Sequence, residues 1–232
     1  MKRWLAALML MMQAPAPAQD WADLAFYRDR NQALRAGGPQ PEIVFIGDSI
    51  TLGWQDRQPE FFTPLRLNRG IGGQTTPQLL LRFRQDVIDL HPKLVHIMGG
   101  TNDIAGNTGP MTAAQTEGNL ASMAELAQAA GIGVILASIP PAALFPWRPE
   151  LSPEPQIEAI NAWLRHYAAA HHCQYADYWT VLKDDRGGLP AAFSSDGVHP
   201  NATGYLIMRP VVEAIVEKDS KRAGAAKRRK KL

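Results

Sequence analysis

The stretch Glu42-Ile43-Val44-Phe45-Ile46-Gly47-Asp48-Ser49-Ile50 decides how the rest of the chain is interpreted. It begins as a run of β-branched and aromatic residues, which is typical of a strand buried on both faces of a sheet. Gly47 ends the run and permits a tight turn. The turn would place the hydroxyl group of Ser49 at the carboxyl end of a central strand, where open α/β sheets carry their chemistry. Because Gly, Asp and Ser are also common turn residues, this stretch alone leaves a plain turn equally open.

Similar strand-like runs recur along the chain and alternate with helical patterns. The runs cover residues 65–68, 94–98, 133–139 and 174–178, and the helical patterns cover 20–35, 75–90, 112–130, 157–167 and a last helix from 201. This alternation predicts an α/β fold, a three-layer sandwich with a flavodoxin-like parallel five-stranded sheet in the order 2-1-3-4-5 and helices on both faces. Pro210 should kink or restart the last helix.

The chain has 232 residues, 46% of them hydrophobic, which fits one globular domain over residues 19–217. Residues 1–18 have the features of a signal peptide: a basic start at Lys2 and Arg3, a short apolar run, and the small-residue sequence Ala16-Pro17-Ala18 before Gln19. The alternative is an uncleaved membrane anchor. We therefore expect export to the periplasm or the medium.

Basic residues are concentrated in the segment 218–232, outside the predicted domain. Eight Lys or Arg residues against one Asp give residues 218–231 a net charge of +7, and Lys2 and Arg3 add +2. Because the whole chain carries +2, residues 19–217 carry −7, which argues against nucleic-acid binding. The tail is predicted to be disordered, either simply solvated or in weak contact with an anionic surface such as lipid headgroups. Cys173 is the only cysteine, so no internal disulfide and no cysteine-based metal cluster can form.

A serine nucleophile needs a base, a group that orients the base, and donors for the oxyanion. Among the six histidines only His199 has an aspartate, Asp196, three residues before it. In a turn this spacing brings the carboxylate to the imidazole, which would fix its tautomer and leave the other ring nitrogen for Ser49. Alone, the pair is equally compatible with a turn cap beside a surface histidine.

Oxyanion donors are also available after the second and third predicted strands. Gly72 and Gly73 let main-chain N–H groups approach a ligand, and Asn102 offers a side-chain amide. The glycines are also compatible with a sharp strand-to-helix turn, and Asn102 with an Asx turn. A phosphate-binding loop fits poorly, because residues 70–75 lack both the third glycine of a dinucleotide motif and the lysine of a P-loop.

Taken together, these segments resemble the four sequence blocks of the SGNH (GDSL) hydrolase superfamily. The blocks are Gly47-Asp48-Ser49, Gly72-Gly73, Gly100-Thr101-Asn102-Asp103 and Asp196-x-x-His199, in the family's order. The resemblance covers residues 42–216, and the pattern around Gly73 is similar to the platelet-activating-factor acetylhydrolase-like members. Four blocks in order are far more specific than any one of them.

The resemblance implies an ester hydrolase with one role for each matching residue. Ser49 would be the nucleophile, with its own N–H, the N–H of Gly73 and the amide of Asn102 as oxyanion donors. His199 would be the general base and Asp196 its partner. The reaction would be acyl transfer to Ser49 and then to water, without a metal or an organic cofactor.

The substrate is not defined by these blocks. The Pro-rich loop at residues 140–155 should overhang the site, where Trp147 could stack on a sugar ring or line an acyl pocket and Arg148 could hold an anion. Alternatively, Phe145 and Trp147 only pin the loop to the domain. We expect an exported esterase for short-acyl or acetyl esters, small or polymer-borne. A lysophospholipase or acyl-thioesterase and a non-catalytic binding module are the alternatives, and the oligomeric state is unknown.

Overall fold

The computed structural model describes residues 20–229, with side chains as far as residue 221, and its centre is one parallel sheet. The strands are β1 (Ile43–Gly47), β2 (Arg66–Gly70), β3 (Leu94–Met98), β4 (Gly133–Ala137) and β5 (Gln174–Ala176). They are ordered β2-β1-β3-β4-β5, and every neighbouring pair is parallel. This is the predicted fold, and the predicted topology is confirmed. The predicted signal peptide, residues 1–18, lies outside the described residues.

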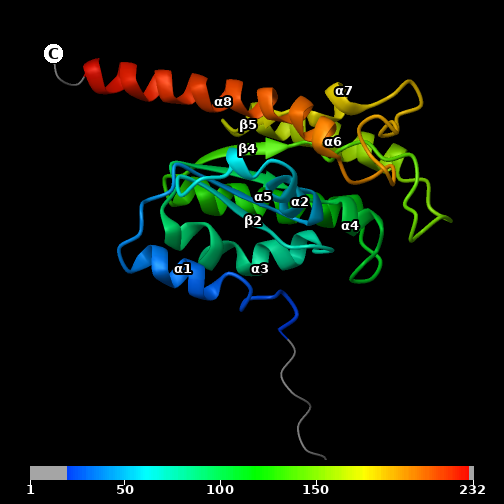
Figure 1. Cartoon of the computed structure of the whole chain (residues 1–232), viewed down its shortest axis with the longest axis horizontal. Helices are drawn as coiled ribbons and strands as arrows, with labels where there is room; N and C mark the ends of the chain where they lie inside the picture. Colours follow the sequence, from blue (N-terminus) through cyan, green and yellow to red (C-terminus); the bar gives the residue numbers. More distant parts are fainter. Residues whose placement is uncertain (1–19, 230–232) are drawn as a thin grey trace, which may run out of the picture.

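Helices cover both faces of the sheet, and Figure 1 shows α8 and α3 on opposite sides of the strands. Buried residues of α3, α5 and α6 form one core with alternate residues of the strands, and residues of α2, α7 and α8 form the other. The helices are α1 (Arg28–Arg35), α2 (Ser49–Arg57), α3 (Thr76–Asp86), α4 (Thr101–Ile104), α5 (Ala113–Ala129), α6 (Glu154–Ala170), α7 (Tyr178–Leu182) and α8 (Ala202–Arg229), with short 3₁₀ turns at Pro59–Phe61 and Ile88–Leu90.

The register of β1 with its two neighbours, β2 and β3, brings the ends of these three strands to one level. Gly47 is paired with Gly70 of β2 on one side and with Met98 of β3 on the other. A Cβ atom on Gly47 would lie 2.1 Å from Thr51 Oγ1 and 2.4 Å from the Met98 carbonyl oxygen, so only glycine fits this junction. The loops that follow the three strands are therefore neighbours at one edge of the sheet.

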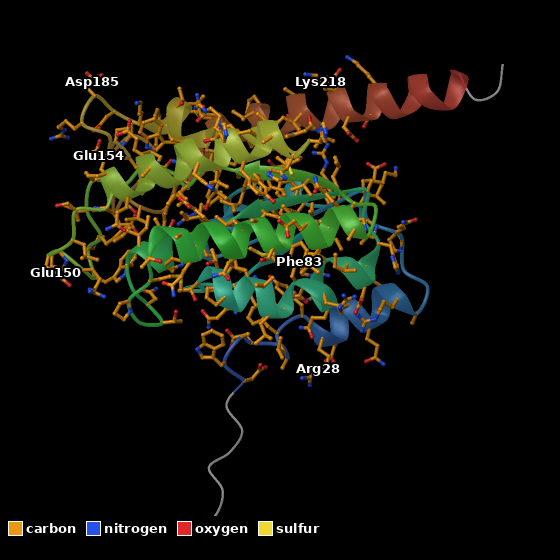
Figure 2. All side chains as sticks on the ribbon, turned by 180° about the vertical axis from the view of Figure 1, so that it is seen from behind. Arg28, Phe83, Glu150, Glu154, Asp185 and Lys218 are labelled. Carbon is orange, nitrogen blue, oxygen red and sulfur yellow. The ribbon has the colours of Figure 1, made fainter. Side chains whose placement is uncertain are left out.

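Loops from the later strands extend to the same end of the molecule. Figure 2 shows Glu150, in the loop after β4, and Asp185, in the loop after α7, at one end of the long axis, and Lys218 of α8 towards the other. Within the part of the chain that the structure describes, no helix is long and apolar enough to cross a bilayer.

Two helices differ from the sequence prediction. Residues 20–27 form turns instead of helix, because the Asp20 carboxylate accepts hydrogen bonds of 2.8 Å from the N–H groups of both Leu24 and Ala25, and α1 begins only at Arg28. The helix does not restart at Pro210, as one form of the prediction had it: α8 continues through this residue. Buried Met208 and Val212 anchor the helix on both sides of the exposed Pro210, so packing outweighs the lost hydrogen bond.

The predicted domain boundary at residue 218 does not coincide with the end of a helix. α8 continues as far as Arg229, into the basic segment that was expected to be disordered. Alanine, lysine and arginine are strong helix formers, which explains why the helix extends beyond its last core contacts.

Candidate active site

Ser49 is the first residue of α2, directly after the end of β1. The side chain of Asp48 caps this helix by accepting a 2.9 Å hydrogen bond from the N–H of Ile50, and Tyr205 of α8 donates a 2.8 Å bond to the Ile50 carbonyl. The first turn of α2 is thus held at both sides, and the Ser49 hydroxyl is fixed at the edge of the sheet. The plain turn that the sequence left open is instead a strand-to-helix junction with a serine at the helix start.

His199 reaches Ser49 from the far end of the chain. The Ser49 Oγ and His199 Nε2 atoms are 2.9 Å apart, and the His199 Nδ1 and Asp196 Oδ2 atoms are 2.7 Å apart. Because a carboxylate can only accept, the proton of the imidazole lies on Nδ1, and Nε2 is left to accept the hydroxyl proton of Ser49. The three side chains form a continuous hydrogen-bonded chain.

The Asp196 carboxylate is held by the loop that carries it. Its Oδ1 accepts hydrogen bonds from the N–H groups of Val198 and His199 and from the hydroxyl of buried Ser194. Partial burial alone would raise the pKa of Asp196, but the bonds from the main chain and side chain of His199 and from Val198 outweigh it and lower that pKa to about 2. Asp196 therefore remains ionised and keeps the His199 ring in one orientation.

The two further residues predicted to face an oxyanion, Gly73 and Asn102, follow β2 and β3. Gly73 follows β2 with a φ of +74°, a left-handed conformation that favours glycine. Asn102 is buried in the short helix α4, and its Nδ2 lies 3.0 Å from the Gln74 carbonyl oxygen and 3.4 Å from Asp48 Oδ2. These contacts join the loops after β1, β2 and β3 beside Asp48, the residue that precedes Ser49.

Asn107 links the two predicted oxyanion donors. Its Nδ2 donates a 2.8 Å hydrogen bond to Asn102 Oδ1 and lies 3.4 Å from the Gly73 carbonyl oxygen. Asn102 Oδ1 accepts the bond from Asn107, and Asn102 Nδ2 donates to the Gln74 carbonyl oxygen. Together these two bonds define the orientation of the Asn102 amide group. The donor atom of that amide therefore faces the Asp48 side of the site.

Asp48, the residue before Ser49, has a buried carboxyl group. Burial raises the pKa of Asp48 to about 6, against the opposing effects of the Ile50 N–H bond and of nearby His199. Asp103, the neighbour of Asn102, binds Thr76 and Thr116, and burial also raises the pKa of Asp103. The two aspartates fasten α2 and α4 to the surrounding elements.

The two residues expected to contact substrate lie in the loop after β4. Trp147 is 41% exposed and stacks on buried Phe145, with the ring centroids 5.2 Å apart, and its ring lies 6.2 Å from that of His199. Arg148 donates a 2.6 Å bond to the Ala105 carbonyl oxygen and another to Glu150. Trp147 therefore borders the site, whereas the guanidinium group of Arg148 is engaged with groups of the protein.

A small hollow of about 200 Å³ adjoins Asp196, lined also by Leu144, Arg186 and Leu189. A larger hollow of about 530 Å³ is lined by Leu34 and Pro41, which precede β1, and by His91, which precedes β3. It therefore lies at the opposite edge of the sheet. Among the described residues, no group of three or more His, Cys, Asp or Glu side chains is arranged to hold a metal ion.

Sequence reasoning missed three side chains that organise the site. Ser194 supports the Asp196 carboxylate, Asn107 binds Asn102, and Tyr205 holds the first turn of α2. All three are polar, but only the partner of Tyr205 is distant in the sequence, 155 positions away. The one local indication was the position of Ser194 two residues before Asp196, which is typical of a side chain that closes a turn.

With this geometry in place, known proteins give a consistent comparison. Residues 45–207 match the family model described as GDSL-like Lipase/Acylhydrolase family. The solved structure of a GDSL-like lipase from Bacteroides thetaiotaomicron is 44% identical, covers 85% of this chain and 98% of that one, and has a TM-score of 0.81. Esterase TesA of Pseudomonas aeruginosa is 30% identical over 172 residues, 68% of this chain and 79% of that protein.

A third relative is matched over a shorter segment. The alpha1 subunit of rat platelet-activating factor acetylhydrolase IB is 35% identical over 91 residues, 38% of this chain and 37% of the subunit. The chain thus spans only about a third of the length of curated relatives of this kind.

The chain belongs to the GDSL-like lipase/acylhydrolase family. The match covers both ends of the hydrogen-bonded chain, from the strand before Ser49 to the helix after His199. The predicted family, whose members are described as lipases and acylhydrolases, is confirmed.

Proposed function

We propose that this protein is a serine esterase that hydrolyses carboxylic esters with Ser49, His199 and Asp196 as its catalytic triad. The observation that carries the proposal is the pair of contacts at His199: 2.9 Å from Nε2 to the Ser49 hydroxyl and 2.7 Å from Nδ1 to the Asp196 carboxylate. These distances allow proton transfer from the nucleophile to the base without rearrangement.

The reaction would run in two steps. Ser49 attacks the ester carbonyl while His199 takes its proton, and the oxyanion receives hydrogen bonds from the N–H groups of Ser49 and Gly73 and the amide of Asn102. His199 then gives the proton to the leaving alcohol, which leaves an acyl group on Ser49. In the second step His199 activates water, which releases the acid and restores the hydroxyl group.

The accessibility of the site favours short acyl groups. The side chains of His199 and Asp196 are both 39% exposed, and the hollow beside them measures only about 200 Å³. A long acyl chain gains its binding energy from an extended apolar channel. We therefore favour acetyl or other short-acyl esters, either small or carried on a polymer, over a lysophospholipase or acyl-thioesterase activity.

The first test is the hydrolysis of p-nitrophenyl acetate by wild-type protein and by S49A. We expect wild-type turnover and a loss of about 10⁴- to 10⁶-fold in kcat for the variant. Turnover that survives S49A would disprove the role of Ser49. A wild-type protein inactive on all esters and thioesters would favour the third hypothesis, a non-catalytic binding module.

A chain-length series separates the two enzymatic hypotheses. On p-nitrophenyl esters from acetate to palmitate, the proposal requires kcat/KM to be highest for the shortest chains. If palmitate reacts fastest, or if lysophosphatidylcholine or acyl thioesters are preferred to acetyl esters, the lysophospholipase or thioesterase alternative replaces it.

We also propose export through residues 1–18 and weak contact of the basic segment 218–232 with anionic surfaces. The sequence features described above support both proposals. Mass spectrometry of protein recovered outside the cytoplasm should give a chain that begins at Gln19. A full-length mass would contradict cleavage. Sedimentation with anionic vesicles at low salt, reversed by salt, would support the surface contact, and its absence would refute it.

A further inference from the structure

Trp147 is an aromatic side chain that is both exposed and rigidly placed beside the proposed base. It is 41% exposed, and its ring lies 6.2 Å from the imidazole of His199 with the planes tilted by 35°. It also stacks at 17° on the ring of Phe145, which is fully buried. Contact between the apolar indole ring and water is unfavourable, so covering the ring is favourable. A fixed, exposed tryptophan that borders a site is therefore a candidate contact for substrate.

The loop around Trp147 is fastened before any substrate arrives. The N–H of Arg148 donates a 2.9 Å bond to the Phe145 carbonyl oxygen, closing a turn, and the Arg148 guanidinium binds the Ala105 carbonyl oxygen at 2.6 Å. Ala105 follows α4, the helix that carries Asn102. The indole is therefore held at a fixed position relative to the site, which reduces the entropy lost on binding.

Because Trp147 lies beside His199, the role of His199 determines which half of an ester Trp147 would contact. In acyl transfer the base gives its proton to the oxygen of the leaving alcohol, so this oxygen must come within hydrogen-bond reach of His199 Nε2. The carbonyl oxygen lies instead on the side of Gly73 and Asn102. A ring attached to the leaving oxygen would extend past the imidazole, into the region that Trp147 borders.

We propose that Trp147 is the binding platform for the leaving alcohol and that this alcohol is a sugar ring. The inference rests on the proposed esterase function and names its substrate class: short-acyl esters of carbohydrates. The apolar C–H face of a pyranose packs on a flat indole, and its hydroxyl groups remain in water at an exposed edge.

The cation next to Trp147 in the chain, Arg148, is not free to bind a phospholipid headgroup. A phosphodiester headgroup needs a cationic partner, but the adjacent Arg148 is bound to Ala105 and to Glu150, with 2.6 Å between Arg148 Nε and Glu150 Oε1. Glu150 places a carboxylate beside the same loop. A neutral sugar ring needs no cationic partner, and the Glu150 carboxylate does not repel it.

The test compares two acetates that differ only in the alcohol: a monoacetylated methyl β-xyloside and ethyl acetate. We expect W147A to lower kcat/KM by about 3- to 10-fold on the sugar ester and by less than about 2-fold on ethyl acetate, with W147F close to wild type. The ratio of acetate to butyrate turnover for one alcohol should not change. W21A, which removes a tryptophan with 46% exposure in the turns before α1, should leave both esters unaffected.

Three results would overturn the inference. An equal loss on both acetates would mean that Trp147 acts only on His199. A changed acetate-to-butyrate ratio would place the acyl group on the indole. A larger W147A effect on lysophosphatidylcholine than on the sugar ester would assign the platform to a lipid headgroup.

A binding measurement keeps this inference separate from the esterase proposal. In ¹⁵N-labelled S49A, the indole N–H resonance of Trp147, identified by its absence in S49A/W147F, should shift when the xyloside acetate is added. If the wild-type protein hydrolyses no ester, the esterase proposal fails, and the shift still decides whether Trp147 binds the sugar. No shift at saturating ligand refutes the platform.

Discussion

Arg82, a fully buried residue of α3, donates a 2.9 Å hydrogen bond to the carbonyl oxygen of Gly47, two residues before Ser49. The same guanidinium group binds Asp86 at 2.9 Å and Gln74 at 2.6 Å. The end of β1 is thus held from inside the molecule by a buried ion pair. Such a pair is strongly destabilising when only one member is removed, because a charge remains buried without its partner.

We expect R82M to lower the free energy of unfolding by about 3–5 kcal/mol, since Asp86 is left buried beside an apolar side chain. Urea denaturation followed by circular dichroism measures this. The matched control is R165A, which breaks the partly exposed pair between Arg165 and Asp177 and should cost less than about 1 kcal/mol. Equal losses in the two variants would show that burial does not distinguish the pairs.

Replacing Asp196 by asparagine should leave the loop folded but lower kcat by about 10²- to 10⁴-fold. The amide at this position would favour the tautomer with the proton on Nε2, which can no longer accept the proton of Ser49. The effect is measured as kcat on p-nitrophenyl acetate. S195A changes the neighbouring exposed residue and should retain wild-type activity. A D196N variant with more than half of the wild-type kcat would refute the orienting role.

The Asn107–Asn102 contact predicts a positioning effect on the oxyanion site. In N107D an acceptor replaces the donor opposite Asn102 Oδ1, 2.8 Å away, so the Asn102 amide is displaced. We expect N102A to lower kcat by about 10²- to 10³-fold and N107D by about 10-fold, with KM nearly unchanged.

The double variant N102A/N107D provides the control for this prediction. If Asn107 acts through Asn102, the double variant should be no slower than N102A alone. Additive losses would show that Asn107 affects the reaction by another route, such as its contact with the Gly73 carbonyl oxygen.

The buried carboxyl group of Asp48 predicts a dependence of stability on pH. Its pKa in the folded protein is about 6, above the unfolded value near 3.8, so the folded state binds this proton more tightly. The contribution of Asp48 to stability is therefore complete below about pH 4 and is lost as pH rises through about 6. The D48N variant has no such proton to lose.

We expect the unfolding free energy of D48N to rise relative to wild type by on the order of 2–3 kcal/mol between pH 4 and pH 7. Urea denaturation at several pH values measures the difference. Asp196 does not interfere, because its pKa is lowered to about 2: its contribution to stability is complete above about pH 4 and is lost only as pH falls from about 4 to about 2. Parallel curves for the two proteins would contradict a raised pKa at Asp48.

The fold could be predicted because its strands and helices carry local patterns. β1, β3 and β4 are apolar on both faces, as a central parallel strand requires, and Thr112 with Gln115 forms the expected capping box at the start of α5. Pro210 was misjudged for the same reason. Its local effect on a helix is strong, but packing at Met208 and Val212 is not visible in the local sequence.

The site was predictable only at the ends of strands, where parallel topology dictates which loops meet. Ser49 and Asn102 were located in this way, and in the structure the Asn102 amide lies 3.4 Å from the carboxyl group of Asp48, the residue before Ser49. Arg82 and Asp86, four residues apart on a helix, instead look like an exposed ion pair in the sequence. Their burial depends on acceptors supplied by β1 and by the loop before α3, which no spacing rule reveals.

The contact between Ser49 and His199 joins residues 150 positions apart, and Tyr205 of α8 closes the same junction at Ile50. A nascent chain therefore displays its serine long before it has a base to activate it. This contact can form only after residues 49–199 have been synthesised, and long-range contacts of this kind form slowly. On the proposed function, the protein would therefore gain its activity only after α8 has docked.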